Sequence, residues 1–181
     1  MASRLLLSFL LFLLLSLTAA HKHNLKQKYS HLHFYFHDSI TGRNATAVPV
    51  TKLAAGAHPQ SYFGIIAIMD DPLTEGPELN STLLGRAQGL YAATGQEEVS
   101  LLMTMNLAFT AGKYNGSVLS VLGRNQPLHP VREMPIVGGT GLFRFARGYV
   151  LARTHCLDLD TLDATVEYDV HVIHYGKILD V

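Results

Sequence analysis

The sequence has few charged residues, a single cysteine and no tryptophan. Only 15% of its 181 residues are charged, and 14 Lys and Arg balance 14 Asp and Glu. A nucleic-acid-binding protein needs a basic surface to neutralise phosphates, so this balance argues against that class. Hydrophobic residues make up 48% of the chain, which argues against intrinsic disorder. The length favours one domain.

The single cysteine, Cys156, excludes a disulfide framework within the chain and any multi-cysteine metal site. Its simpler interpretation is a buried, inert thiol, and the alternative is a disulfide to another chain. No cofactor fingerprint is present either. Gly138-Gly139-Thr140-Gly141 is followed by neither a third glycine at position 144 nor Lys-Ser/Thr, so it predicts a tight turn into a strand.

An apolar segment at the start of the sequence predicts export. Arg4 precedes an apolar run from Leu5 to Leu17, and Thr18-Ala19-Ala20 supplies the small residues of a cleavage site. The run is shorter than the roughly 20 apolar residues that span a bilayer. Residues 1–20 are therefore predicted to be a secretory signal peptide, and residues 21–181 a single secreted domain without a membrane anchor.

Three Asn-x-Ser/Thr sequons agree with export. Their acceptor residues are Asn44, Asn80 and Asn115. A single sequon occurs by chance, but three in an exported chain predict at least one glycan and place these segments in exposed loops.

Period-two alternation of apolar residues recurs after the signal segment and predicts β-strands. Strands are expected at 31–37, 62–69, 83–93, 101–109, 118–122, 143–152 and 165–174. Turn signals separate them, among them Asp71-Pro72, Asn115-Gly116 and Gly138–Gly141. Short connections without helices make seven or eight strands antiparallel, and closing the sheet removes its edges. The predicted fold class is an all-β antiparallel barrel.

Three histidines, His31, His33 and His37, share one face of the first strand and could bind a metal. Asp38 lies on the opposite face, with the phenylalanines, so it cannot join them at one ion. No metal site is predicted, and the histidines are expected to be solvated or at an interface. At the mouth of the barrel, a partly desolvated Asp38 would suit proton transfer. The alternative is that it caps the following turn.

Seven segments, in order along the chain, resemble the plant dirigent proteins. They are His-Phe-Tyr-Phe-His-Asp at 33–38, Met-Asp-Asp-Pro-Leu-Thr at 69–74, Gly-Arg-Ala-Gln-Gly-Leu-Tyr at 85–91, Gly-Lys-Tyr-Asn-Gly-Ser at 112–117, Arg-Glu-Met-Pro-Ile-Val-Gly-Gly-Thr-Gly at 132–141, Ala-Arg-Gly-Tyr at 146–149 and Val-Glu-Tyr at 166–168. The match that they define spans nearly all of the sequence after the signal segment.

The resemblance implies an eight-stranded antiparallel β-barrel of the dirigent and allene-oxide-cyclase type, secreted to the apoplast as a homotrimer or a homodimer. It implies a protein without cofactor or oxidative activity. A laccase or peroxidase would supply radicals, and the barrel would bind phenolic intermediates and make their coupling or cyclisation stereoselective, as in lignan formation. A related group implies an alternative, an enzyme that dehydrates an isoflavanol to a pterocarpan through a quinone methide. A lipocalin-like binding protein fits the barrel but not these motifs.

The resemblance also assigns site residues. It implies catalytic roles for Asp38 and Arg132, and substrate contacts for Tyr91, Asn125, Phe34 and Phe36. Two positions differ from lignan-forming members, which have a second acid where Asn125 stands and a second tyrosine where Ala93 stands. Asparagine has no titratable proton, so Asp38 is predicted to be the principal acid.

Overall fold

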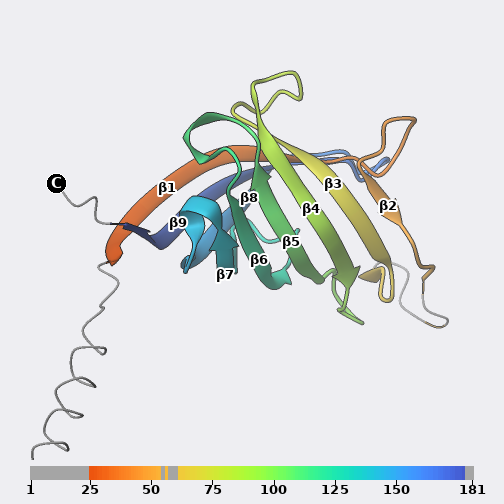
Figure 1. Ribbon diagram of the computed structural model, residues 1–181. Coiled ribbons are helices and arrows are strands. Elements are labelled where there is room, and N and C mark those ends of the chain that lie inside the picture. Colours follow the sequence, from red (N-terminus) through yellow and green to blue (C-terminus); the bar gives the residue numbers. More distant parts are fainter. Residues whose placement is uncertain (1–24, 54–55, 57–60, 178–181) are drawn as a thin grey trace, which may run out of the picture. The chain divides into compact units, whose positions relative to one another are not determined.

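The computed structural model describes residues 25–53, 56 and 61–177 (Figure 1). The predicted signal peptide lies outside the described residues. Residues Gln27–Tyr175 form one compact unit. Within the described part of the chain, no helix is long and apolar enough to cross a bilayer.

The strands of this unit form a closed antiparallel barrel. In the described residues one sheet has the order β1-β9-β8-β7-β6-β5-β4-β3-β2, and β1 also pairs with β3. That pairing sets Tyr35 opposite Thr74 and Phe36 opposite Leu73. It closes eight strands into a ring, while β2 pairs with another part of the same edge of β3. The strands are β1 (Leu25–Asp38), β2 (Ala47–Pro49), β3 (Ile66–Thr74), β4 (Leu83–Ala93), β5 (Leu101–Phe109), β6 (Val118–Asn125), β7 (Arg132–Thr140), β8 (Arg147–Leu157) and β9 (Ala164–Lys177). The predicted fold class is confirmed.

The core fills the barrel because alternate residues of each strand point inward. Phe34, Leu107, Met134 and Tyr168 are each at most 2% exposed. The ring of Phe34 stacks on Tyr168 with 5.7 Å between centroids. Burial of each large side chain contributes about 1.5–3 kcal/mol, so these inward faces provide the main stabilisation of the barrel.

The turn expected at Asp71-Pro72 is wrong, because both residues lie inside β3. The Asp70 N–H donates to Thr46 O on the β2 side of the strand. Backbone nitrogens alternate in direction along a strand, so the Pro72 nitrogen points to the same edge of β3 as the Asp70 nitrogen. It lies between the segments that pair with β2 and with β1, where no ladder donor is required.

Strand β7 was absent from the predicted strands, because Pro135 and Gly138-Gly139 interrupt its alternation. It nevertheless pairs with both β6 and β8. The turn expected at Gly138–Gly141 begins only at Gly141, which has a φ of +63° and starts the 3-10 helix η3 (Gly141–Phe143). The Asn115-Gly116 turn between β5 and β6 is confirmed, and Gly116 has a φ of +77°.

Candidate functional site

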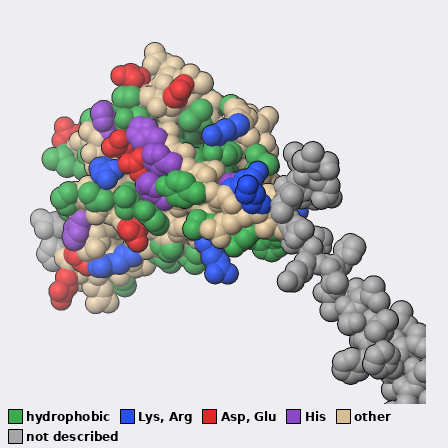
Figure 2. Space-filling view, turned by 90° about the vertical axis from the view of Figure 1, so that its left-hand side faces the viewer, with side chains coloured by type: hydrophobic (Ala, Val, Ile, Leu, Met, Phe, Trp, Pro, Cys, Tyr) green, Lys and Arg blue, Asp and Glu red, His purple; other side chains and the backbone are tan. Residues whose placement is uncertain are grey.

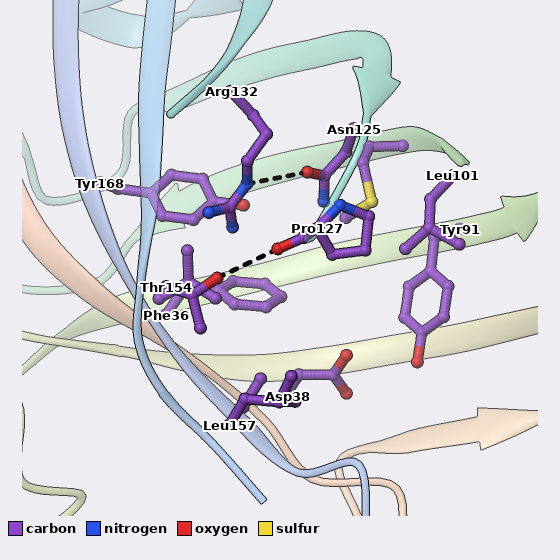
Figure 3. A pocket seen from close by; sticks show the side chains of 13 residues that line it. Phe36, Asp38, Tyr91, Leu101, Asn125, Pro127, Arg132, Thr154, Leu157 and Tyr168 are labelled. Atoms are coloured by element: carbon purple, nitrogen blue, oxygen red, sulfur yellow. Dashed lines mark hydrogen bonds between the residues drawn. The ribbon is translucent and has the colours of Figure 1, made fainter. Parts of the chain in front are cut away.

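A pocket of about 70 Å³ lies at one end of the barrel interior (Figure 3). In an antiparallel barrel, the last residues of one strand lie beside the first residues of the next. The ends of β1, β4, β6 and β8 and the starts of β5, β7 and β9 therefore meet here. The lining residues are Phe36, Asp38, Tyr91, Leu101, Met103, Asn125, Pro127, Arg132, Thr154, Leu157, Ala164, Val166 and Tyr168.

Asp38, the last residue of β1, supplies a carboxyl group to this pocket (Figure 3). Burial raises the pKa of Asp38 to about 6, partly offset by the Tyr91 hydroxyl and reinforced by the Asp163 carboxylate. The Oδ1 atom is buried and has no hydrogen-bond partner among the described residues. The group therefore changes protonation near pH 6, as suits a general acid or base.

Asp38 does not cap the turn that follows it. The Ser39 N–H donates to Thr46 Oγ1 at 3.2 Å, and the Ile40 N–H donates to Asp163 Oδ1 at 2.8 Å. Asp163 therefore caps the turn that follows β1, and the Asp38 carboxyl is directed into the pocket. The turn-cap alternative is wrong.

Tyr91 of β4 supplies a phenol beside this carboxyl. Its side chain is 7% exposed, and its hydroxyl has no hydrogen-bond partner among the described residues. Burial raises the pKa of Tyr91, and the neighbouring Asp38 and Asp71 raise it further. Tyr91 therefore stays a neutral hydrogen-bond donor over the physiological range.

Arg132, at the start of β7, supplies the positive charge of the pocket. It is 4% exposed. Its Nε donates to Asn125 Oδ1 at 3.2 Å, and its Nη1 donates to the His129 carbonyl at 3.4 Å. Burial lowers the pKa of Arg132, but a guanidinium stays protonated. No carboxylate of the described residues pairs with it, so it is suited to bind an anionic ligand oxygen.

The two phenylalanines have different places. Phe36 lines the pocket, as predicted, but Phe34 does not. Two residues along a strand span roughly 6.6 Å, so Phe34 lies deeper, against Tyr168 and Phe109. The prediction that Phe34 lines this cavity is therefore wrong. Tyr168 was missed as a lining residue, although its alternation with Val166 already placed it on an inward face.

A larger groove of about 740 Å³ adjoins the pocket. The two share Asp38 and Ala164 as lining residues. Drug-sized ligands occupy about 300–1,000 Å³, which the pocket alone does not provide. The groove is lined by His37, Asp38, Ser39, Thr41, Gly42, Arg43, Asn44, Thr46, Pro72, Pro77, Leu79, Cys156, Asp158, Asp163, Ala164 and Thr165.

The histidines of β1 lie on the outside of the barrel, but only two are solvated. His31 and His33 contact Asp169 and Glu167 of β9 at 3.1 and 2.8 Å. Figure 2 shows histidine and acidic side chains next to one another on one face of the molecule. His37 is 7% exposed, with Nε2 2.6 Å from Thr74 Oγ1, so the expectation of a solvated or interface residue is wrong for it. In the described residues, no group of three or more His, Cys, Asp or Glu could hold a metal ion.

The sequon asparagines Asn44, Asn80 and Asn115 are exposed and lie between strands. Cys156 is also exposed and free, so the interpretation as a buried thiol is wrong. It follows a register shift between β8 and β9 at Thr154, which breaks the inward and outward alternation of β8.

A closed barrel with a mostly apolar pocket at its end, into which a few polar groups point, is the architecture of a β-barrel that binds small molecules. The profile of the family described as "Dirigent-like protein" matches residues 29–173. The chain therefore belongs to the dirigent family.

Curated relatives and a solved structure agree with this membership. The chain is 52% identical over 151 residues to "Pterocarpan synthase 1" of Glycyrrhiza echinata, which covers 83% of this chain and 80% of the relative. It is 51% identical over 150 residues to "Dirigent protein 7" of Arabidopsis thaliana, covering 83% and 79%. The structure of the pterocarpan synthase dirigent protein GePTS1 matches with a TM-score of 0.80 and 51% identity, covering 86% of this chain and 90% of that one.

Proposed function

We propose that this protein converts an isoflavanol to a pterocarpan by loss of water through a quinone methide. The carrying observation is a pocket in which a protonatable Asp38 faces a buried Arg132 without a carboxylate partner. Sequence identity alone does not choose this activity, because the two named relatives match almost equally. Asn125 supports it, since no second acid lines the described pocket.

Formation of the quinone methide needs an acid at the leaving group. Asp38 gives its proton to the benzylic hydroxyl, the C–O bond breaks with its electron pair on oxygen, and water leaves. The phenol of the same ring releases its proton to solvent and becomes the carbonyl of a neutral quinone methide. Arg132 donates hydrogen bonds to that oxygen. It stabilises the negative charge that the oxygen carries just before the quinone methide forms and just after the nucleophile has added to it.

Ring closure reverses these proton movements. The second phenol of the substrate adds through its oxygen to the benzylic carbon, and its proton returns to the Asp38 carboxylate. The first ring regains its phenol by taking a proton from solvent. The sum is loss of one water without oxidation or reduction, so this reaction needs no cofactor or oxidase.

The pocket walls would provide the stereoselectivity. Phe36, Leu101, Met103 and Val166 exclude competing water from the electrophilic carbon. If the pocket favours attack on one face of the quinone methide over the other by about 1.4 kcal/mol, the product of that face forms about tenfold faster. The phenol ring would occupy the pocket, and the rest of the substrate the adjoining groove.

A second function is stereoselective coupling of phenoxy radicals supplied by a laccase or peroxidase, as in lignan formation. The adjoining pocket and groove favour it, because they offer two compartments that meet at Asp38. In this function the protein binds the phenolic intermediates and does not oxidise them.

One experiment separates the two functions. The purified protein is incubated with each stereoisomer of an isoflavanol without oxidant, and in parallel with coniferyl alcohol and laccase. Chiral chromatography of the products is the measurement. We expect pterocarpan from one isoflavanol isomer without oxidant. Racemic coupling products together with no pterocarpan would contradict both functions.

The rate should depend on the protonation of Asp38. Its pKa is raised to about 6, so the acid form persists to higher pH than for an ordinary Asp. We expect kcat/KM for the isoflavanol to be constant below about pH 6 and to fall as the pH rises through that value. Rates measured from pH 4.5 to 8.5 test this, and a fall centred near pH 4 would contradict it.

We further propose that residues 1–20 are removed on export to the apoplast, that at least one sequon is glycosylated and that the mature chain is a homotrimer. Ile68 of β3, Leu102 of β5 and Leu122 of β6 support assembly, since these apolar side chains are 47%, 39% and 45% exposed on the outside of the barrel. Intact mass before and after deglycosylation, with native mass, tests all three. Retained Met1, unchanged mass or a monomer would contradict the corresponding part.

A further inference from the structure

Asp71 is a buried acid that the mechanism above does not use. It lies in β3 between Met69 and Leu73 and shares their inward face. It is 0% exposed, and neither carboxylate oxygen has a hydrogen-bond partner among the described residues. Buried carboxyl groups are normally paired or hydrogen-bonded, so an unpartnered one is costly and calls for a functional explanation.

The register of the barrel places Asp71 beside Asp38. Phe36 of β1 pairs with Leu73 of β3 in antiparallel orientation. The β1–β3 pairing ends at this pair, but two residues further along β1 is Asp38 and two residues back along β3 is Asp71, so the end of β1 brings Asp38 towards Asp71 on the inward face. The two carboxyl groups interact electrostatically, since the Asp38 charge raises the pKa of Asp71.

The surroundings of Asp71 favour its protonated form. Burial raises the pKa of Asp71 to about 8, with the Asp38 carboxylate as the second cause. Asp70 adds to the rise, whereas the Thr46 hydroxyl and Arg86 oppose it. Arg86 lies on the outer face and pairs there with Asp70, with Nε 2.6 Å from Oδ1, so it does not neutralise the buried acid.

Asp71 also acts on the tyrosines of the pocket. Its charge contributes to the raised pKa of Tyr91 and of Tyr168, both of which line the pocket. The Tyr91 hydroxyl is itself buried and unpartnered. Asp71 therefore interacts electrostatically with groups that would meet a substrate, although it does not itself line the pocket.

We infer that Asp71 is a positioning residue that shares a proton with Asp38 and so returns a proton to it after Asp38 has lost its own. The inference rests on the proposed acid role of Asp38. The transfer is a tautomeric exchange, in which Asp71 releases its proton and becomes the carboxylate while the Asp38 carboxylate takes one up. Water would carry the proton, because neither Asp71 oxygen has a hydrogen-bond partner among the described residues. The pair then holds two protons at low pH, one at intermediate pH and none above, and its titration steps belong to both groups.

The pH profile of the rate is the first test. In the wild type, the rate should fall near pH 6 to a lower plateau and fall again above about pH 8. The plateau arises because, between these two values, the pair holds one proton and a constant fraction of the molecules carry it on Asp38. In Asp71→Asn the plateau is lost, and the rate falls tenfold per unit from about pH 6. We expect equal rates at pH 5 and a deficit of roughly tenfold or more at pH 8.

Asp70→Asn is the matched control. Asp70 neighbours Asp71 in the chain, but its side chain is 54% exposed on the opposite face. It should keep the plateau, and its upper step should move only slightly to lower pH, because Asp70 is the last of the causes that raise the pKa of Asp71. An Asp71→Asn profile that retains the plateau, or loses rate equally at all pH values, would overturn the inference.

A spectroscopic titration tests the pair without any substrate. In infrared difference spectra, the wild type should keep one buried protonated carboxyl between about pH 6 and pH 8, and Asp71→Asn should lack it. Asp38→Asn should shift the remaining Asp71 titration to lower pH, because the neighbouring charge is gone. If no carboxyl titrates above pH 6 in the wild type, the inference fails whatever the protein's substrate. If the carboxyl signals agree but no substrate turns over, only the proposed function fails.

Discussion

Asp38→Asn is expected to lower turnover of the isoflavanol by roughly 10²-fold or more, the usual weight of general acid catalysis. Asparagine has nearly the same shape but cannot give a proton to the leaving hydroxyl. The structure supports an undisturbed fold in this variant, because Asp163 rather than Asp38 caps the following turn. Single-turnover rates and the enantiomeric excess of the product are the measurements.

Asp160→Asn provides the control for this variant. Asp160 is exposed between β8 and β9 and does not line the pocket. It should match the wild type in rate and stereoselectivity. If Asp38→Asn also keeps both, another group delivers the proton and the role assigned to Asp38 is wrong.

Arg132→Met is expected to lower turnover by roughly 10²-fold to 10³-fold, the loss seen when a preorganised donor to a developing oxyanion is removed. Stability should respond differently. A buried guanidinium without a carboxylate partner carries a desolvation cost, and a methionine of similar length removes that cost together with the contacts to Asn125 and His129. The free energy of unfolding should therefore change by no more than about 2 kcal/mol.

Arg132→Lys separates charge from geometry at this position. Lysine keeps the positive charge but not the planar fork of donors, so its rate should lie between those of the wild type and Arg132→Met. Chemical denaturation and kinetics on the same preparations give both quantities. A strongly destabilised Arg132→Met protein with normal turnover per folded molecule would show that Arg132 is structural.

The inward position of Asp38 could be predicted because strand alternation is a local property of the sequence. The phenylalanines before it fix which face of β1 is apolar, and Asp38 continues that face to the strand end. The resemblance added Tyr91, Asn125 and Arg132, whose meeting depends on strands far apart in the chain. Alternation alone cannot say how far a residue lies from the barrel end, which is why Phe34 was misplaced.

Asp71 shows the opposite case. The pair Asp71-Pro72 carries a strong turn signal, and it was interpreted as a break between strands. Pairing with β4 and a gap in the ladder on the other edge override that local preference and turn Asp71 into the barrel. Its electrostatic interaction with Asp38 depends on barrel closure, which no local pattern of the sequence records.

The pairing of β1 with β9 has a consequence for how the chain folds. From β3 to β9, each strand pairs with the next in sequence, so these hairpins can form as soon as their residues are available. Among the described residues, β1 has only two registered pairs with β3, and its pairing with β9 must wait for the last strand, since its contact from His31 to Asp169 joins residues 138 apart. Closing so long a loop costs entropy before any contact repays it, which raises the contact order and slows the final step. Until that step, the inward face of β1 has no barrel to enter. Amide hydrogens of β1 should therefore gain protection from exchange last, in the same event that brings Asp38 to the pocket.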